Sequence, residues 1–447
     1  MRSAVAAIFV YKGHLLNIIR QTSLAAFPGF TAFPGGKIDE GDEQHAIEHP
    51  LLSHYPSVEI GALIREIREE LGFDLADALH EEQVLSISKF GSAMTPPDQK
   101  HRFNIHFYKI ELSSKPTLEL NKEEVNKAQW MTPSDLLTRY HSGQAMIVSA
   151  TLAITRALAE NTDATTADIN PTFHKDQLPI LPFIHDVNQI FVPSNTLPPA
   201  TATNALLVGD EGALRILTDP SPASKQVLQT LKNTLDGKRP DALFLSHHHP
   251  DHHERLPQLA RDWGIPVLCS KQCETRLLSR FGDDYLVNVE IQHVKQGDVI
   301  TQWQGEEVIC HELAGHDDSM VGLAPESLAW FYVADLVEPG TTVVIPEPEG
   351  DMAVYFDSLK RVIAMQPKHI IPSHGLPVLG TELLSQTLAH REAREQQILD
   401  AYHSGLRDDA LLEALYPRLA EKLIPYAAQN IRQHLRKLGL YSEGKAS

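Results

Sequence analysis

Hydrophobic positions follow two different periods in the amino-terminal part of the chain. Apolar residues fill positions 4–10 and return at 15–19 after a polar break that contains Gly13, which predicts a β-hairpin with a glycine turn. Further along, apolar residues recur at every fourth position, at Leu63, Ile67 and Leu71. This spacing predicts a helix with one buried face, and we expect the acidic residues beside the stripe to lie at the surface.

Later in the chain, short apolar runs end in polar residues. The runs 243–245, 330–333 and 369–371 are each followed within three residues by histidine, serine or aspartate. Such runs are typical of buried strands, so we expect the polar residues at the strand ends. Beyond residue 382 the pattern changes to long helical periodicity, with apolar residues at Leu383, Leu384, Leu388, Ile431, Leu435 and Leu438.

The chain divides at a polar stretch, residues 160–170, which is followed by a segment containing several prolines. Its length of 447 residues is typical of two or three domains. We therefore predict a first domain at 1–158, a linker at 159–184, a second domain at 185–382 and a helical carboxy-terminal part at 383–447.

The most concentrated chemistry lies in residues 246–253, which contain five histidines and one aspartate. In an extended segment alternate side chains leave on the same side, so His247 and His249 can share one metal ion. Asp251 and His252 then face a neighbouring site. Imidazole nitrogen with few carboxylates suits zinc, and iron or manganese fits almost as well. The alternatives are a solvated loop and a fortuitous histidine-rich tract.

Further candidate ligands follow where other apolar stretches end, at His316, Asp335 and His374. The series H-x-H-x-D-H, a later histidine, an aspartate after a strand and a final Ser-His-Gly resembles the metallo-β-lactamase superfamily over residues 185–380. The resemblance implies two metal ions with Asp335 as a bridge between them. The first ion would be held by His247, His249 and His316, and the second by Asp251, His252 and His374.

Two such ions can share a hydroxide and stabilise the leaving oxygen or sulfur, and Asp251 would orient that hydroxide. The sequence departs from the family at Asp317, where a threonine is usual, and at 253–255, where a glycine-rich turn is usual. His248, His253 and His311 have no place in the pattern, and we expect them to support the ligands or to lie at the surface.

The family branches that this region resembles are the glyoxalase II-like and endoribonuclease-like ones. Only 38 residues separate Asp335 from His374, too few for the extra domain of the large RNA-cleaving members. The end of the chain, including 429–438, resembles the winged-helix-like piece of the small lactamase-like group. Its basic residues either touch an anionic substrate or form the solvated face of a packed helix.

A second constellation lies near the amino terminus, where residues 33–39 precede 65–73, Arg-Glu-Ile-Arg-Glu-Glu-Leu-Gly-Phe. Together they resemble a Nudix box. On a helix Glu66, Glu69 and Glu70 cluster on one face, and such hard oxygen ligands favour Mg²⁺ or Mn²⁺. The resemblance implies that these glutamates act as metal ligands or base, that Arg65 orients a carboxylate and that Gly36 contributes backbone. The alternative is an amphipathic helix with a charged wet face.

This Nudix box is unusual in two respects. Asp42 replaces the usual glutamate, and an insert at 43–60, expected to be a surface excursion, precedes Arg65. A similar interruption occurs in the Nudix branch that cleaves coenzyme A and its thioesters, which 95–96, 102–103 and 107–108 also resemble. Inactivation of the Nudix site by the insert stays open.

Composition and charge exclude several other classes of protein. A hydrophobic content of 42% is enough for normal cores, and no apolar run reaches the roughly 18 residues of a membrane span. The start of the chain reads as a hairpin and not as a signal peptide, and three cysteines are too few for a disulfide framework. These features predict a cytoplasmic protein. A net charge of −19 argues against broad nucleic-acid binding.

We predict an α/β and α+β multidomain chain: a Nudix α/β/α sandwich, a metallo-β-lactamase αββα sandwich and a helical, winged-helix-like end. The predicted function is bifunctional hydrolysis, with Asp251, Arg65, Glu69 and Glu70 as catalytic residues. The Nudix site would hydrolyse the diphosphate of a nucleoside-diphosphate-linked or coenzyme A-type substrate, and the lactamase-like site would hydrolyse a thioester or another ester. The predicted cofactors are two zinc ions, with iron or manganese as alternatives, and Mg²⁺ or Mn²⁺ at the Nudix site. An acyl-coenzyme A, a small anionic molecule, offers both a diphosphate and a thioester. The alternatives are RNA cleavage and a Nudix module that senses a ligand without cutting it.

Overall fold

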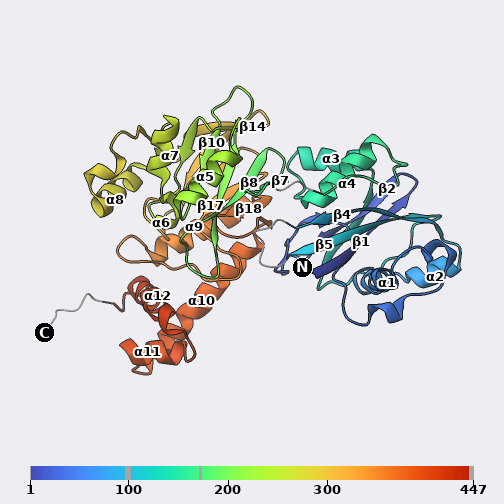
Figure 1. Ribbon diagram of the computed structural model, residues 1–447. Helices are drawn as coiled ribbons and strands as arrows, with labels where there is room; N and C mark the ends of the chain where they lie inside the picture. The colour runs from blue at the N-terminus through green and yellow to red at the C-terminus, as the bar shows by residue number, and fades with distance from the viewer. Residues whose placement is uncertain (1, 96–101, 171–173, 442–447) are drawn as a thin grey trace. The chain divides into compact units, whose positions relative to one another are not determined.

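The computed structural model describes residues 2–95, 102–170 and 174–441. It divides into two compact units, Met1–His185 and Asp186–Ser447, whose elements are labelled in Figure 1. Within the described ranges, no helix is long and apolar enough to cross a membrane.

The first unit is built on a mixed sheet with the strand order β3-β2-β1-β5-β4, and β6 pairs with β2. The predicted hairpin is confirmed, because β1 and β2 are antiparallel and Val10 lies opposite Leu15 across the turn. β1 runs parallel to β5. The strands of this unit are β1 (Arg2–Tyr11), β2 (His14–Arg20), β3 (Thr31–Ala32), β4 (Val84–Met94), β5 (Phe103–Leu112), β6 (Val125–Met131) and β7 (Ile180–Ile184).

Helices cover both faces of this sheet (Figure 1). Alternate residues of β1 point to opposite faces, so Val5 belongs to the core cluster under α1 whereas Ile8 belongs to the one under α4. The predicted apolar stripe of α1 is confirmed, since Leu63, Ile67 and Leu71 are fully buried. The helices are α1 (Ser57–Leu71), α2 (Leu75–His80), α3 (Pro133–His141) and α4 (Ser149–Glu160).

The insert before Arg65 is more ordered than a surface excursion. It forms two 3₁₀ turns, η1 (Asp42–His45) and η2 (Pro50–Leu52), and its last residues form the first turn of α1. Leu52 and Ile60 are buried in the core under α1. The expectation of a purely superficial loop was therefore wrong, because apolar residues of the insert pack beneath the helix. Of the coenzyme A-branch positions, Pro96 lies outside the described residues.

The second unit contains two sheets. The first has the strand order β13-β12-β11-β10-β9-β8, and the second has the order β14-β15-β16-β17-β18-β19. The strands of the first sheet are β8 (Val187–Pro193), β9 (Ala202–Val208), β10 (Ile216–Thr218), β11 (Ala242–Phe244), β12 (Val267–Cys269) and β13 (Ile291–His293). Those of the second are β14 (Val299–Trp303), β15 (Glu306–Glu312), β16 (Val321–Pro325), β17 (Phe331–Ala334), β18 (His369–Pro372) and β19 (Val378–Leu379).

The three apolar runs identified in the sequence are the buried strands β11, β17 and β18. Their ends carry the candidate ligands into loops, as expected. The helices and 3₁₀ turn around the sheets are α5 (Lys225–Thr234), α6 (Pro250–His253), α7 (Leu256–Trp263), α8 (Lys271–Phe281), η3 (Asp283–Leu286) and α9 (Met352–Met365).

The end of the second unit is helical, drawn in orange to red in Figure 1. Ile398, Leu411, Ile431 and Leu435 form a small core of its own there. Helices at the predicted positions are thus confirmed. They are α10 (Glu382–His403), α11 (Asp408–Leu415) and α12 (Ile424–Lys437), with the 3₁₀ turn η4 (Glu421–Leu423) between the last two.

Candidate metal centres

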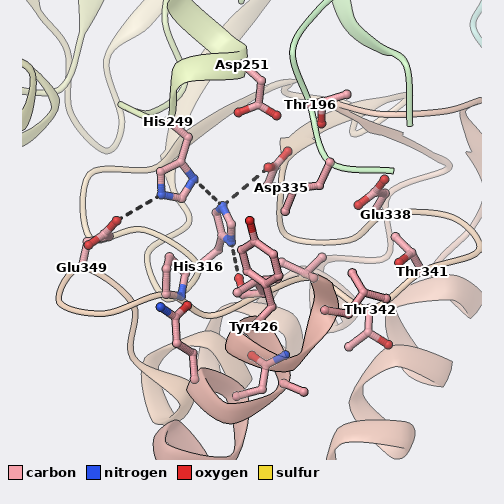
Figure 2. A pocket seen from close by; sticks show the side chains of 18 of the residues that line it. Thr196, His249, Asp251, His316, Asp335, Glu338, Thr341, Thr342, Glu349 and Tyr426 are labelled. Atoms are coloured by element: carbon pink, nitrogen blue, oxygen red, sulfur yellow. Dashed lines mark hydrogen bonds and ion pairs between the residues drawn. The ribbon is translucent and has the colours of Figure 1, made fainter. Parts of the chain in front are cut away.

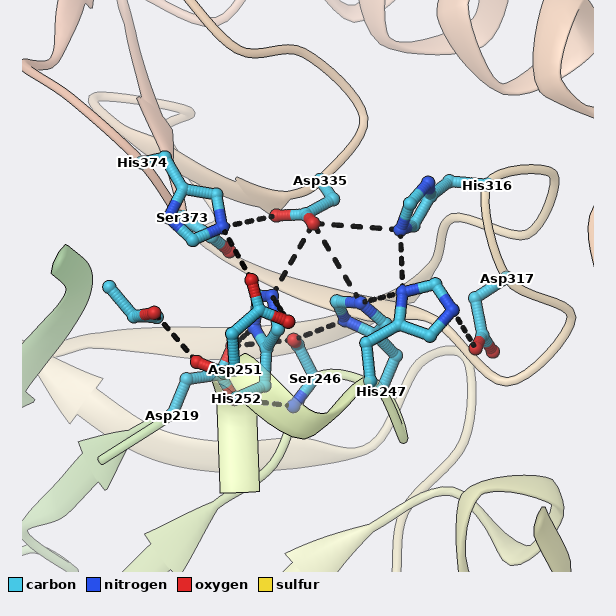
Figure 3. Close-up of polar contacts among 12 residues, drawn as sticks. Asp219, Ser246, His247, Asp251, His252, His316, Asp317, Asp335, Ser373 and His374 are labelled. Atoms are coloured by element: carbon cyan, nitrogen blue, oxygen red, sulfur yellow. Dashed lines mark hydrogen bonds and ion pairs between the residues drawn. The ribbon is translucent and has the colours of Figure 1, made fainter. Parts of the chain in front are cut away.

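The histidines and aspartates predicted as ligands in the second unit come together in two groups (Figure 3). Their ligand atoms lie within 4.8 Å of one another in each group. The residues arrive on loops after β11, β15, β17 and β18 and on the short helix α6. The first group is His247, His249, His316 and Asp335, and the second is Asp251, His252 and His374.

In the first group three ring nitrogens face one another. His249 Nδ1 lies 3.0 Å from His247 Nε2 and 2.9 Å from His316 Nε2. Nitrogens bound to one tetrahedral zinc ion lie about 3.3 Å apart, given Zn–N bonds of about 2.0–2.1 Å. The three imidazoles therefore already have nearly the spacing that a shared ion requires.

Asp335 connects the two groups. Its Oδ2 lies 3.5 Å from His316 Nε2 and 3.4 Å from His252 Nε2, and its Oδ1 lies 3.7 Å from His374 Nε2. Ala334 directly before it has a positive φ of 49°, a conformation unusual for a residue with a side chain. The carboxylate is thus placed where the predicted bridge requires it.

Backbone carbonyls fix which nitrogen of each histidine faces the site. His316 Nδ1 donates to Val344 O at 2.7 Å, and His374 Nδ1 donates to Ala202 O at 2.9 Å. A carbonyl oxygen only accepts, so the proton lies on Nδ1 and the Nε2 lone pair of the neutral ring faces the other ligands. Histidines that bind metals have this arrangement.

Asp219 has a supporting role that the sequence did not reveal. Its buried carboxylate lies 2.9 Å from His252 Nδ1 and accepts hydrogen bonds from Ser246 N at 2.7 Å and from the Tyr332 hydroxyl at 2.5 Å. It stands at the end of β10, after an apolar run like those before the ligands. That position was the one available signal, but nothing in it connects Asp219 to His252.

Burial and the two carboxylates have opposite effects on the histidines of the site. Burial lowers the pKa of His316 to about 4. Burial also opposes protonation of His374, but the carboxylates of Asp335 and Asp251 raise its pKa to about 9. In the described part of the chain, Oδ1 of Asp335 is buried without a hydrogen bond. A nitrogen and oxygen donor set with an orphaned carboxylate oxygen fits a pair of divalent ions.

Three further histidines, His248, His253 and His311, do not belong to these two groups. His248 Nδ1 lies 2.5 Å from Asp317 Oδ2, so the aspartate that replaces the usual threonine holds a neighbour of the ligands. His248 also faces His249 and Glu349, a third group of possible ligands. Nδ1 of His253 lies 2.6 Å from the Tyr285 hydroxyl. On β15, His311 packs against the ring of Phe331.

A cavity of about 1060 Å³ opens onto these residues (Figure 2). Asp251, Asp335 and His374 line one part of it. Glu338 and Tyr426, which no sequence pattern singled out, also contribute to the lining. Helices α8, α10 and α12 supply much of the remaining wall. The candidate centre therefore has access to a space large enough for a small-molecule substrate.

In the first unit, the Nudix-like residues surround Arg65. Its Nε donates to Asp42 Oδ1 at 2.7 Å, and its Nη1 donates to Glu66 Oε1 at 2.9 Å and to Glu69 Oε2 at 3.0 Å. Burial opposes ionisation of Asp42, but the hydrogen bond from Arg65 lowers the pKa of this carboxyl below its usual range. The unusual Asp42 is thus a direct partner of Arg65.

The expectation that the acids of α1 lie at the surface was wrong for two of them. Glu66 and Glu70 are 8% and 2% exposed, because the loop that contains Gly35 and Gly36 covers them. Glu70 Oε2 accepts a hydrogen bond from Gly35 N at 2.8 Å, and burial raises the pKa of Glu70 to about 8. A Cβ on Gly36 would lie 2.4 Å from the Glu66 carboxyl group, so glycine at this position leaves room for the carboxylate where it stands.

The glutamates of α1 are less closely assembled than the histidines of the second unit. In the described ranges, all groups of three or more possible ligands within 4.8 Å belong to the second unit. Glu66 and Glu69 share Arg65, whereas Glu70 is held by the Gly35 amide.

Comparison with known families agrees with both sites. A family model described as the NUDIX domain matches residues 1–150, and one described as the metallo-beta-lactamase superfamily matches residues 198–374. A third, the beta-lactamase associated winged helix domain, matches residues 409–447. The first match contains Arg65 and the glutamates, and the second contains every predicted ligand from His247 to His374.

Among curated proteins, the chain is similar to the Beta-lactamase-like protein 2 homolog of Drosophila melanogaster. The two are 26% identical over 258 residues, which span 54% of this chain and 83% of that protein. A solved beta-lactamase domain protein from Burkholderia ambifaria is 20% identical with a TM-score of 0.48, covering 57% of this chain and 86% of that one. A NUDIX hydrolase from Alicyclobacillus acidocaldarius is 25% identical with a TM-score of 0.33, covering 38% of this chain and 98% of that one.

These matches and the two-unit architecture confirm the predicted α/β and α+β multidomain fold with a winged-helix-like end. The chain is a metal-dependent hydrolase in which a NUDIX domain is fused to a domain of the metallo-β-lactamase superfamily and a carboxy-terminal winged-helix domain.

Proposed function

We propose that the chain is a bifunctional hydrolase of acyl-coenzyme A-type molecules. The lactamase-like site would hydrolyse a thioester or another ester, and the NUDIX site would hydrolyse a diphosphate. The observation that carries the proposal is the pair of ligand groups joined by Asp335 and opening into a cavity of about 1060 Å³. A coenzyme A thioester is one molecule with a scissile bond for each site.

Two zinc ions fit the lactamase-like ligand set, with iron or manganese as alternatives. When bound, such ions would activate a water molecule and stabilise the leaving sulfur or oxygen. The first ligand group would hold one ion and the second group the other, with Asp335 between them. Asp251 lines the cavity with its side chain 18% exposed. This exposure supports the proposal that its carboxylate orients the attacking water.

At the NUDIX site, Mg²⁺ or Mn²⁺ fits the carboxylate ligands and would bind diphosphate oxygens. Glu66, Glu69 and Glu70 would supply the carboxylates. Arg65 would orient Glu66 and Glu69 through the hydrogen bonds that it makes to both. The exposed Glu69 is the carboxylate best placed to take a proton from the attacking water, because its side chain is 53% exposed.

A small anionic substrate is better supported than RNA. On the basic helix α12, Arg432 and Arg436 pair with Glu347, and Lys437 pairs with Glu395. Two carboxylates offset most of the charge of these three cations, which weakens their attraction for a polynucleotide backbone. The net charge of −19 supports the same conclusion.

The proposal is tested by mass spectrometry of products after the metal-replete protein has been incubated with a panel of acyl-coenzyme A thioesters. Free coenzyme A that disappears in His249→Ala supports the lactamase-like activity. Acyl-phosphopantetheine that disappears in Glu69→Gln supports the NUDIX activity.

Three outcomes would contradict parts of this proposal. Absence of both products would exclude coenzyme A thioesters as substrates. Cleavage of single-stranded RNA that is lost in His249→Ala would favour the endoribonuclease alternative. Tight binding of a diphosphate without turnover, unchanged in Glu69→Gln, would instead identify the NUDIX domain as a ligand sensor.

A further inference from the structure

The cavity wall contributed by α10 carries two arginines that lack acidic partners. Arg391 and Arg394 both line the cavity, and in the described part of the chain neither lies within 4.0 Å of a carboxylate. By contrast, Arg276 on α8 lines the same cavity and pairs with Asp318 at 2.5 Å. In a chain with a net charge of −19, two unpaired arginines on one helix are unusual.

Burial makes the missing counter-charge significant. Arg391 is only 2% exposed, and its Nη2 donates to Val343 O. Within the described ranges, Nε of both Arg391 and Arg394 is buried without a hydrogen-bond partner. A guanidinium taken out of water without an anion is costly, so an anionic ligand would supply a stabilising interaction that the protein alone does not.

One short loop connects Arg391 to the metal centre. The carbonyl of Val343 accepts from Arg391, and the carbonyl of the next residue, Val344, accepts from His316. Asn430 on α12 holds the same loop by accepting from Ile345 N at 2.9 Å. Arg394 donates through Nη1 to Leu415 O at 3.1 Å, and both arginines line the same cavity as the metal ligands.

The surroundings of the arginines suit a multiply charged oxyanion such as phosphate. Arg394 lies over the ring of Tyr416 at 4.4 Å, which orients its guanidinium plane. Burial and then the positive charges of Arg391 and Arg394 lower the pKa of the neighbouring His390, so this histidine adds no charge of its own near neutral pH. Arginine matches phosphate oxygens in a two-pronged geometry.

We propose that Arg391 and Arg394 form a phosphate subsite for the substrate of the lactamase-like domain. The scissile group would lie at the metal ligands, while a phosphate elsewhere on the same molecule would bind between α10 and the 341–346 loop. This inference rests on the proposed thioester hydrolysis and makes it more specific. It identifies the substrate class as acyl compounds with a phosphorylated carrier, and it makes Arg394 a specificity-determining residue.

The test compares two thioesters of the same acyl group, one on coenzyme A and one on N-acetylcysteamine, which has no phosphate. The full chain is used in a Glu69→Gln background, so that the diphosphate stays intact. Because Arg391 also supports the fold through Val343, the informative variants are Arg394→Gln and Arg394→Lys. Arg418→Gln, an exposed change on the neighbouring segment, serves as the matched control.

We expect Arg394→Gln to lower kcat/KM for the coenzyme A thioester by about 10- to 100-fold, the effect of losing a charge-assisted hydrogen bond. The N-acetylcysteamine thioester should be hydrolysed as by the parent, which also shows that the variant is folded. Arg394→Lys should partly restore kcat/KM for the coenzyme A thioester, and Arg418→Gln should leave kcat/KM for both thioesters unchanged. Equal loss on both thioesters, or no loss on either, would overturn the subsite.

Calorimetric binding of 3′,5′-ADP separates failure of the subsite from failure of the proposed function. If no thioester is hydrolysed, the proposed function fails. The subsite still stands if 3′,5′-ADP binds and Arg394→Gln weakens that binding by about tenfold or more. It falls if 3′,5′-ADP does not bind, or binds equally well to Arg394→Gln. If the protein cleaves RNA and this cleavage depends on Arg394, the phosphate subsite stands but its substrate is RNA and not a thioester.

Discussion

The two candidate metal sites of this chain are organised in opposite ways. In the lactamase-like site, five histidines and two aspartates face one another, and hydrogen bonds from outside hold their rings. In the NUDIX site, Arg65 and the Gly35 amide occupy the glutamate oxygens that a metal ion would bind. Carboxylates lie among the imidazoles of the first site and raise the pKa of His374 to about 9, whereas the NUDIX carboxylates repel one another without a cation.

The geometry of the two sites should therefore depend on a bound metal ion to different extents. The histidine site is preorganised, so metal binding should change its geometry little. The NUDIX glutamates have to exchange protein partners for metal, and burial already raises the pKa of Glu66 and Glu70. A cation would lower these pKa values again by stabilising the ionised carboxylates.

The largest effect is expected for Asp335→Asn. Because this carboxylate contacts histidines of both groups, its loss removes the common ligand and one negative charge. We expect ester or thioester turnover to fall by about 1000-fold, equal to about 4 kcal/mol of transition-state stabilisation. Metal analysis of the purified variant should show fewer than two ions per chain. Unchanged metal content with full activity would contradict the bridging role, and unchanged NUDIX turnover is the internal control.

A large effect confined to the first unit is expected for Gly36→Ala. The added Cβ would lie 2.4 Å from the Glu66 carboxyl group and displace it. A shift of about 1 Å in a catalytic group can cost about 100-fold, so we expect diphosphate hydrolysis to fall by that order. Turnover at the lactamase-like site, assayed in the same sample, should not change. Full NUDIX activity in this variant would show that Glu66 has no part in the reaction.

The sequence was most informative where chemistry follows local order. Strand ends are visible as the ends of apolar runs, so His316, Asp335 and His374 could be predicted to follow such runs, whereas their grouping around metal ions was implied by the family resemblance. The helical stripe of α1 was equally visible. Burial of Glu66 and Glu70 was not, because it depends on a loop some 30 residues away that covers them.

The same limit applies to supporting residues. Asp219 contacts His252 and Ser246, which lie 33 and 27 positions later in the chain, and Arg391 reaches Val343 across 48 positions. No periodicity or spacing encodes such contacts, since they arise only when sheets and helices pack. Metal ligands carry a sequence signature, whereas the residues that orient them do not.

An intermediate effect is expected when this support is removed by Asp219→Ala. His252 would lose the partner of its Nδ1, and loss of such a partner typically costs 10- to 100-fold in metal affinity, so we expect about that reduction. Competition with a chromogenic chelator measures it. Tyr332→Phe removes one hydrogen bond to the same carboxylate and should lower the free energy of metal binding by about 1 kcal/mol or less. If Asp219→Ala binds metal as tightly as the parent, the site is not preorganised by this network.

The smallest effect concerns a third acid of α1, the partly buried Glu59, whose carboxylate is satisfied by the protein alone. It accepts hydrogen bonds from Lys89 at 2.7 Å and from Tyr108 at 2.5 Å. Burial raises the pKa of Glu59, but these bonds outweigh it and the net shift is downward. Its contribution to stability is therefore present above the pKa of the unfolded chain and is lost as the pH falls through the lower folded pKa.

Burial raises the folded pKa of Glu66 and Glu70, so acidification stabilises the fold at those two groups, and the response of Glu59 has to be measured as a difference between variants. Hydrogen exchange of the α1 amides between pH 7 and pH 3 should show an acid-dependent loss in the free energy of local opening that is about 1 kcal/mol smaller in Glu59→Gln than in the parent, because the group no longer titrates. The exposed control Glu48→Gln should behave like the parent. An equal response in Glu59→Gln and in the parent would mean that Lys89 and Tyr108 do not stabilise the ionised Glu59, and the distinction between an acid satisfied by the protein and acids that await a cation would not hold within this helix.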